Sequence, residues 1–588
     1  MKIINSQNQI SEVDFASGGN KIFWHSASHL LACAVKRLYP SAKLAIGPAI
    51  DNGFYYDFLV DEPFSAEDLE KIETEMRKIS KENLKFEPFT LSRDEALDFC
   101  KDEPLKVELI NDLPEDETIS FFKLGDFIDL CAGPHITYAS SIKAIKLLSS
   151  TSAYWRGDSS RENLQRIYGV AYPKAAELEE HLAKLEEAKS RDHNVLGRNL
   201  GFFTTHPTIG QGLPLLTAKG SKVMQILQRL VEDEGEKRGY NLVKTPIMAK
   251  SDLYKISGHW QKYKDGMFVI DDDYELALRP MTCPFQFMIY KSELHSYKDL
   301  PVRFLENATL FRNEHSGEMH GLIRVRQFTL SDGHIICAPD SLEAEFNHAM
   351  KFITEMIAAV GLADDVYYCF SKWDASNAEK YLGEPQEWEQ TQDLMRGILQ
   401  RMNLNFYEED GEAAFYGPKL DIQMKNVYGK EDTLFTIQID FALAKRFDLT
   451  YVDENGEKQH PYIIHHSVLG AYERLFAMLI EKYAGALPLW LAPVQATILP
   501  ISDKFAGYAS EISDKLRSAG IRCEIDSRSE KIGYKIRAAQ LAKIPFMLVV
   551  GEKEQESGLI SVRSREKGDL GQLSPEEFLT NFQQNQSH

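Results

Sequence analysis

The 588-residue sequence has no apolar run long enough to span a membrane. The best candidate, AGALPLWLAPV, is short and broken by prolines, whereas a spanning helix needs about 20 apolar residues. The first residues, MKIINSQNQI, lack the apolar core of a secretory signal, so we expect no secretion. Cysteine is scarce as well. The seven cysteines are scattered, which argues against a disulfide framework and favours reduced thiols in the cytoplasm.

Basic residues are the minority charge, 67 against 88 acidic residues, and the net charge is −21. That balance disfavours a nucleic-acid partner, because phosphate binding requires lysine and arginine, but a chain average can conceal a basic face. The sequence also lacks internal repeats and low-complexity tracts. With 43 % hydrophobic residues, this length predicts a globular chain of three or four domains.

Changes of pattern along the chain predict its domains. A charged stretch with leucines at helical spacing predicts a connecting helix. Alternating segments such as TLFTIQIDFALA predict antiparallel strands in the largest block, and short apolar strands alternating with helices predict a final α/β module. The predicted parts are a short N-terminal arm (1–20), an α+β domain (21–172), the linker helix (173–199), the large block (200–490) and the α/β module (491–588).

Two pairs of potential metal ligands lie about a hundred residues apart. HSASH carries His25 and His29, and CAGPH carries Cys131 and His135. One interpretation is a structural zinc site assembled from both pairs. The other is a hydrolytic site, in which neutral imidazoles orient or deprotonate water. Spacing alone leaves both open.

An arginine-rich stretch, FRNEHSGEMHGLIRVRQFTLSDGH (311–334), is the most informative segment. It offers Arg312 and Glu314, a glycine-bearing loop, and then Arg324, Arg326 and Phe328, which we predict on one strand. Guanidinium groups converging from two strands suit a polyphosphate, and an aromatic ring there could stack on a base. An exposed edge strand is the alternative interpretation.

FRNE followed by a loop and RQF resembles motif 2 of the class II aminoacyl-tRNA synthetases. GAYERLFAMLIE resembles their motif 3, a strand-to-helix segment carrying Arg474, and EKRGYNLVKTPIM resembles motif 1, with Pro246 at the dimer interface. LRPMTCPFQ, FYGPK and TIQIDF follow in the order found in the threonyl-tRNA synthetase family, which the chain resembles from about residue 21 to its end. The resemblance implies an α+β multidomain homodimer with an antiparallel class II catalytic core, an α+β editing domain and a C-terminal α/β anticodon-binding domain.

The resemblance implies a role for each matching residue of the core. Arg312 would bridge the α-phosphate and the substrate carboxylate, Arg324 and Arg474 would hold the ATP phosphates, Glu314 would contact the adenine edge, and Phe328 would stack on adenine. ATP would bring Mg²⁺.

Three further residues belong to the same implied site. Gln438 and Lys419 would line the pocket, and His259 in SGHW would be the base for transfer to the tRNA ribose, although packing beside a tryptophan is the alternative.

Cys283, His334 and His465 match the zinc ligands of the family, one ion per subunit. One thiolate and two imidazoles leave an open position on a tetrahedral Zn²⁺. A hydrophobic pocket separates threonine poorly from isosteric valine, whereas an ion bound to both the amine and the hydroxyl rejects valine. Asp332 would accept the hydroxyl proton, and Tyr416 would help to bind the amino group.

Serine also carries an amine and a hydroxyl, so zinc selection predicts a second, hydrolytic site against seryl-tRNA. The resemblance assigns that site to the N-terminal domain without a metal. It leaves open whether His29, Lys106 or a tRNA ribose hydroxyl is the base. The matching editing residues are His25, His29, Tyr56, Lys106, Asp129, Cys131 and His135.

In the last domain, DSRSEKIGYKIR and EQESGLISVRSR resemble the anticodon-binding domain, with Glu556 and Arg565 as candidate contacts. A solvated loop and an edge strand are the alternative. We predict a local basic surface from Arg528, Lys531, Lys535, Arg537 and Lys543.

The chain departs from the family pattern at three places. About twenty residues stand where most members have a small ubiquitin-like domain, Phe285 and Gln286 replace the usual Gly-His, and Leu330 replaces a polar residue. The resemblance implies activation of L-threonine, its transfer to tRNA(Thr), and hydrolysis of Ser-tRNA(Thr). The rival hypotheses are a catalytically idle paralogue that binds RNA as a regulator and a class II enzyme for proline or serine.

Overall fold

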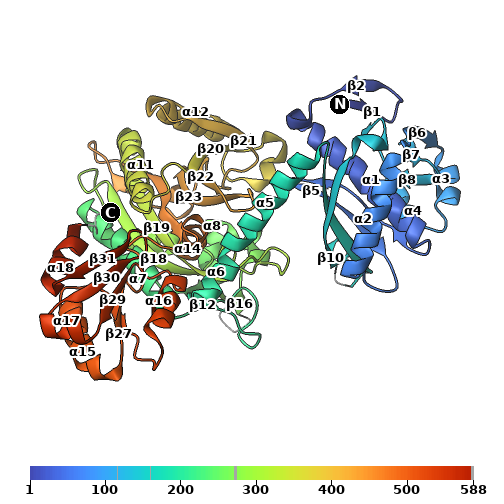
Figure 1. Ribbon diagram of the computed structural model, residues 1–588. Helices are drawn as coiled ribbons and strands as arrows, with labels where there is room; N and C mark the ends of the chain where they lie inside the picture. Colours follow the sequence, from blue (N-terminus) through green and yellow to red (C-terminus); the bar gives the residue numbers. More distant parts are fainter. Residues whose placement is uncertain (116, 159, 271–274, 585–588) are drawn as a thin grey trace. The chain divides into compact units, whose positions relative to one another are not determined.

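The computed structural model describes residues 1–115, 117–158, 160–270 and 275–584. The chain divides into two compact units, Met1–Glu186 and Glu187–His588 (Figure 1). Within the described residues, no helix combines the length and the apolar character that crossing a membrane requires.

The long helix α1 (Asn20–Leu38) lies at the centre of the first unit, where twelve of its residues are buried. It packs against α2 (Ala66–Lys81) and β5 (Gly53–Leu59). One antiparallel sheet has the order β10 (Ala144–Tyr154), β11 (Asn163–Tyr172), β5 and β3 (Lys43–Leu44), with β4 (Ala49–Ile50) also paired to β5. A second is formed by β6 (Phe86–Leu91), β7 (Ile119–Leu124) and β8 (Phe127–Leu130), with α3 (Arg93–Phe99) and α4 (Pro104–Asp112) between β6 and β7 in the chain.

The predicted N-terminal arm is an integral part of this unit. β1 (Lys2–Ile4) pairs with both β2 (Ile10–Glu12) and β9 (His135–Ile136), and Ile4 is fully buried. The β1–β2 hairpin therefore pairs with the strand that begins at His135.

The predicted linker helix is two helices, α5 (Ala175–Arg191) and α6 (His193–Asn199). The break falls at Asp192, whose side chain accepts a hydrogen bond of 2.7 Å from the backbone N–H of Asn194 and so caps α6. Aspartate is a favoured residue at this position because its carboxylate satisfies a backbone donor that the helix leaves free.

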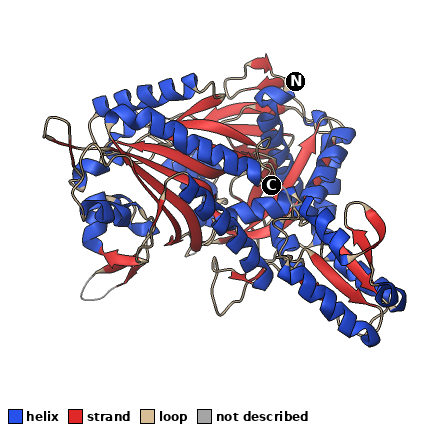
Figure 2. Cartoon of the chain, turned by 90° about the vertical axis from the view of Figure 1, so that its left-hand side faces the viewer, coloured by secondary structure: helices blue, strands red, loops and turns tan. Residues whose placement is uncertain are grey.

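The second unit is built on an eight-stranded sheet, which confirms the predicted antiparallel core. Only the outermost pairs, at β14 and β21, are parallel. Apolar residues of α7 (Ala218–Lys237), α11 (Leu342–Ala359) and α14 (Tyr472–Lys482) join those of the sheet in one large core, and Figure 2 shows long helices lying against the broad sheet. The strand order is β14 (Asn241–Leu242), β18 (Val302–Phe311), β19 (Gln327–Cys337), β26 (Tyr462–Ala471), β23 (Glu431–Asp440), β22 (Lys419–Lys425), β20 (Val366–Lys372) and β21 (Phe406–Asp410).

The C-terminal part of this unit is the predicted α/β module. Its sheet has three parallel strands, β28 (Cys523–Ile525), β27 (Ala496–Pro500) and β29 (Phe546–Val550), extended by antiparallel β30 (Ile560–Ser564) and β31 (Gly568–Leu573). Its helices are α15 (Ala506–Ser518), α16 (Ile532–Leu541), α17 (Glu552–Ser557) and α18 (Pro575–Gln584).

Candidate active site

A single row of residues crosses four strands of the central sheet. His334 on β19 lies opposite His465 on β26, His465 lies opposite Gln438 on β23, and Gln438 lies opposite Lys419 on β22. Directly opposed residues of neighbouring antiparallel strands share a face. The sheet register thus places two predicted metal ligands next to each other on the face that also carries Gln438 and Lys419.

Cys283, the first residue of α10 (Cys283–Lys291), completes this group. Its sulfur and one ring nitrogen each of His334 and His465 lie within 4.8 Å of one another, and all three side chains are buried. One sulfur and two imidazole nitrogens are the donor set of a zinc site that keeps an open position.

Both histidine rings are oriented by oxygen acceptors. Nδ1 of His334 lies 2.7 Å from Oε1 of Gln286, and Nε2 of His465 lies 2.9 Å from Oδ2 of Asp440. Each ring therefore carries its hydrogen toward the acceptor, and its other nitrogen remains for a metal. Asp440 is itself fixed, because its second oxygen accepts from the backbone of Ala442 and Leu443. The residues present fit Zn²⁺.

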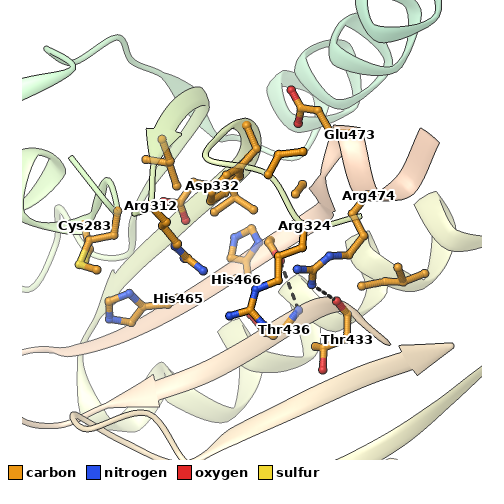
Figure 3. A pocket seen from close by; sticks show the side chains of 18 of the residues that line it. Cys283, Arg312, Arg324, Asp332, Thr433, Thr436, His465, His466, Glu473 and Arg474 are labelled. Carbon is orange, nitrogen blue, oxygen red and sulfur yellow. Dashed lines mark hydrogen bonds between the residues drawn. The ribbon is translucent and has the colours of Figure 1, made fainter. Parts of the chain in front are cut away.

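This group lies at one end of a pocket of about 300 Å³. Figure 3 shows Cys283 and His465 at one end, Arg474 at the opposite end, and Arg312 and Arg324 between them. The pocket thus has a possible metal-binding end and a cationic end, a combination that suits a metal-ligating group beside a polyphosphate.

Arg474 is fixed at the cationic end by backbone carbonyls. Its Nε donates to the carbonyl of Ile323 (3.0 Å) and its Nη1 to that of Thr433 (2.5 Å), the second of which is drawn in Figure 3. Burial lowers its pKa. Arg324 instead forms ion pairs with Glu314 (2.7 Å) and Glu318 (3.0 Å).

The prediction that Arg324 and Arg326 lie on a strand is wrong. β19 begins at Gln327, so both arginines belong to the preceding loop, where the backbone N–H of Arg326 donates to the carbonyl of Gly212 (2.8 Å). The N–H of Arg326 is therefore not available to continue the hydrogen bonding between β18 and β19. The N–H of Arg312 still donates to the carbonyl of Arg326 (2.9 Å) at the end of the hairpin. Phe328 is on β19, and the guanidinium carbon of Arg312 lies 5.1 Å from its ring centre.

Asp332 and Tyr416 both line the pocket. Burial raises the pKa of Asp332 to about 6. The hydroxyl of Tyr416 donates to Oε1 of Gln438 over 2.6 Å, so these two side chains are positioned together.

Lys419 and His259 are not among the residues that line this pocket. The ammonium group of Lys419 is 2.8 Å from Asp421 and is held by that ion pair. His259 is buried, with Nδ1 2.7 Å from the hydroxyl of Ser257, and burial lowers its pKa to about 3. Nε2 of His259 is buried and has no hydrogen-bond partner among the described residues.

In the first unit, the structure brings all seven predicted editing residues into one cluster. Nε2 of His25 and Nε2 of His135 lie 3.1 and 3.3 Å from the sulfur of Cys131. The ring of His29 packs edge-on against both other histidine rings, with centroids 4.9 and 4.5 Å apart. Four segments distant in sequence supply these groups and their neighbours: α1, β5, α4 and the segment from β8 to β9.

A buried carboxylate connects the remaining members. Asp129 accepts a hydrogen bond from the hydroxyl of Tyr56 (2.6 Å), forms an ion pair with Lys106 (2.6 Å), and lies 3.5 Å from Nδ1 of His29. This arrangement balances the charge of Lys106 and directs Nε2 of His29 away from Asp129.

Burial sets the protonation states of this cluster. It lowers the pKa of His25, His29 and His135, and it raises the pKa of Cys131 to about 12. The imidazoles are neutral at pH 7 and the thiol is protonated, as suits ordering a water molecule. The donor atoms of His25, His29, Cys131 and His135 also lie within 4.8 Å of one another, so their geometry admits a metal as well.

The predicted basic surface of the α/β module is smaller than expected. Lys535 is buried, because its ammonium group donates to the carbonyls of Pro500 and Asp526, and Arg528 is paired with the Asp526 carboxylate at 2.6 Å. Glu556 is exposed on α17. Arg565 donates to the carbonyls of Lys543 (2.7 Å) and Leu487 (3.1 Å).

Three residues of the two clusters are not predicted by the sequence motifs. Gln286 stands out in the sequence only as a departure from the family pattern, and Asp440 lies within TIQIDF, where no motif predicts a role for it. Ser26, inside HSASH, lies 3.1 Å from Nδ1 of His135 and orients that ring. Each of these polar residues lies next to or within a motif, and this position is the sequence feature that could have indicated a role.

Three protein-family models match segments of the chain. They describe a second additional domain of threonyl and alanyl tRNA synthetases (residues 119–168), a class II tRNA synthetase core domain for G, H, P, S and T (263–483), and an anticodon-binding domain (495–585). The last two confirm the class II core and the anticodon-binding fold of the second unit.

Curated relatives match nearly the whole chain. The threonine–tRNA ligase of Clostridium perfringens (strain ATCC 13124) is 61 % identical over 582 residues, which cover 98 % of this chain and 90 % of the relative. The threonine–tRNA ligase of Acetivibrio thermocellus is 47 % identical over 569 residues, 96 % of this chain and 88 % of the relative.

Solved structures agree. A structure described as the RNA binding domain of threonyl-tRNA synthetase from Cryptosporidium parvum superposes with a TM-score of 0.64 at 31 % identity, covering 68 % of this chain and 99 % of that one. Prolyl-tRNA synthetase of Giardia lamblia shares the fold, with a TM-score of 0.54 at 18 % identity over 69 % of this chain and 81 % of that one. The chain belongs to the threonine–tRNA ligase family of class II aminoacyl-tRNA synthetases.

Proposed function

We propose that this chain activates L-threonine with ATP, transfers it to tRNA(Thr), and hydrolyses Ser-tRNA(Thr). One observation carries the proposal: a buried Cys/His/His group and a set of arginines occupy opposite ends of the same pocket in a chain of this family. The amino acid binds at the first end and the triphosphate at the second.

Activation is an in-line attack of the threonine carboxylate on the α-phosphate. Arg312, midway between the two ends, contacts both reacting groups and stabilises the charge that develops between them. Arg324 and Arg474 hold the remaining phosphates, whose Mg²⁺ arrives with ATP. Phe328 stacks on adenine, and Glu314, which pairs with Arg324, contacts the adenine edge.

Cys283, His334 and His465 hold one Zn²⁺ per subunit in this proposal. Bound there, the ion would supply a Lewis acid for the amine and the hydroxyl of threonine, whereas valine carries only the amine. Asp332 accepts the hydroxyl proton, and Tyr416, held by Gln438, binds near the amine. We assign the later transfer to the tRNA ribose to His259, whose buried Nε2 has no hydrogen-bond partner among the described residues. Lys419 lies directly opposite Gln438 on the neighbouring strand β22.

Replacing Gln286 with alanine should lower zinc affinity by about 10- to 100-fold, because the ring of His334 loses the acceptor that orients it. The measurement is a competition titration with a chromophoric chelator. Gln392→Ala is the matched control. Gln392 on α12 (Pro385–Arg401) is also buried, and its side chain accepts a hydrogen bond from the backbone N–H of Trp373. Equal zinc affinities of Gln286→Ala and the unmodified chain would contradict the zinc assignment or the role of Gln286.

Editing takes place in the cluster of the first unit. Neutral His25, His29 and His135 order water against the ester of seryl-tRNA, Cys131 anchors two of these rings, and Asp129 positions Tyr56 and Lys106. His29, Lys106 and a tRNA ribose hydroxyl remain the three candidate bases.

Partner surfaces complete the proposal. Glu556 and Arg565 contact the tRNA anticodon, and the guanidinium of Arg565 is held by the backbone carbonyls of Lys543 and Leu487. Two chains form a homodimer through the motif 1 region, where Leu242, Ile247 and Met248 are about 40 % exposed around Pro246. We place the protein in the cytoplasm, since all seven cysteines are free thiols.

The test is threonine-dependent ATP–pyrophosphate exchange, with valine, serine and proline in parallel. We expect exchange with threonine, weaker exchange with serine and none above background with valine. An idle RNA-binding paralogue would give no exchange with any amino acid, and a prolyl or seryl enzyme would prefer its own substrate. Either result would overturn the proposed function.

A further inference from the structure

A buried histidine outside the pocket contacts the loop that carries Arg324. His193, the first residue of α6, is fully buried. Its Nδ1 lies 2.6 Å from Oε1 of Glu481, and its Nε2 accepts a hydrogen bond of 3.2 Å from the backbone N–H of Leu322. The ring therefore connects the end of α14 to residues just before Arg324.

The loop leaves no room for another arrangement. Gly321 has a positive φ of 52°, and a Cβ atom at this residue would lie 2.1 Å from Nε2 of His193. The peptide between Gly321 and Leu322 thus passes directly along the edge of the imidazole. A glycine is required there for both the backbone conformation and the close approach.

The same loop is held on its other side by Arg474. The carbonyl of Ile323, one residue after Leu322, accepts from Nε of Arg474. Arg474 and Glu481 are seven residues apart on α14, which places them on one face of the helix, two turns from each other. Residues 321–323 are therefore fastened to α14 at two points, directly through Arg474 and indirectly through His193 and Glu481.

Glu481 and the linker are fixed in turn. The second oxygen of Glu481 accepts from the backbone N–H of Val427 (3.1 Å). Arg191, the last residue of α5, donates to the backbone carbonyls of Glu481 (3.2 Å) and Lys482 (2.6 Å). These bonds leave His193 little freedom to move relative to α14.

We infer that His193 is a positioning residue for the ATP site: with Glu481 it holds the loop of residues 321–323 so that Arg324 and Arg474 face the triphosphate. The inference rests on the proposed function. It predicts a change in the affinity for ATP and none in the affinity for threonine, because the Cys283 end of the pocket is built from β19, β26 and α10 and does not touch His193.

The experiment compares three variants in the exchange assay. His193→Leu removes both hydrogen bonds, and His193→Gln keeps one donor and one acceptor. His193→Leu with Glu481→Leu also removes the buried carboxylate whose Oε1 loses its ring partner in the first variant. His348→Leu, a half-buried histidine on α11, is the control. The measured quantities are the KM for ATP, the KM for threonine and the thermal unfolding midpoint.

His193→Leu should raise the KM for ATP at least tenfold and leave the KM for threonine within twofold. His193→Gln should recover most of the ATP affinity. The double variant should recover thermal stability but not ATP affinity. Equal changes in both KM values, or recovery of ATP affinity in the double variant, would show a purely structural role and overturn the inference. Exchange by the unmodified chain shows separately that the proposed function stands.

Discussion

Replacing Arg312 with alanine is expected to reduce threonine-dependent ATP–pyrophosphate exchange by about a thousandfold. The guanidinium lies between the two ends of the pocket, where negative charge accumulates as the carboxylate approaches the α-phosphate. Loss of one preorganised donor costs about 10²- to 10³-fold, and loss of an arginine that stabilises a phosphoryl-transfer transition state costs about 10³- to 10⁵-fold. The measurement is kcat/KM for exchange with both substrates varied.

Arg401→Ala is the matched control for that experiment. Arg401 is an exposed arginine that pairs with Glu343 on the protein surface, so its removal should leave exchange unchanged. Arg312→Lys should recover only part of the activity, because an ammonium group cannot bridge two acceptors in the same plane. A loss below tenfold in Arg312→Ala would contradict the role given to this residue.

Replacing Cys131 or His29 with alanine should separate the two chemistries of the chain. Each change should reduce hydrolysis of Ser-tRNA(Thr) by at least about a hundredfold, since positioned acid–base groups contribute about 10²- to 10⁴-fold and Cys131 holds the rings of His25 and His135 in place. Threonine activation should stay within twofold, because both residues lie in the first unit and the pocket lies in the second. The readouts are deacylation of preformed Ser-tRNA(Thr) and ATP–pyrophosphate exchange.

Cys33→Ala provides the comparison within the same helix. Cys33 is buried on α1, and its thiol is not part of the cluster, so hydrolysis should continue at the normal rate. Zinc content is measured for every variant, because the cluster geometry admits a metal. Loss of one equivalent of zinc per chain in Cys131→Ala or His29→Ala would show that the cluster is a metal site and that the hydrolytic interpretation is wrong.

The sequence predicted those parts of the site that depend on local pattern and on long motifs. GAYERLFAMLIE is a strand followed by a helix, with Arg474 in the first turn of α14. HSASH lies on α1, where a spacing of four residues puts His25 and His29 on one face. Such features follow from the regular repeat of residues along a helix or a strand, which is the same in any protein.

Features that depend on packing between distant segments were not predictable in this way. A lysine such as Lys535 is expected at the surface because its side chain is charged, yet backbone carbonyls from two other segments bind its ammonium group. Gln286 acquires its function only because β19 brings His334 beside α10. The break at Asp192 is different: aspartate before a new helical stretch is a known capping signal, and it could have divided the linker.

The row of His334, His465, Gln438 and Lys419 also determines where the length of this chain can vary. Side chains alternate between the two faces of a strand, so inserting or deleting one residue inside β19 or β26 would turn a histidine toward the helices and remove it from the pocket. Insertions in the connections between strands leave the row intact. The connections between these strands, and not the strands themselves, are therefore where this chain can change in length without losing the row.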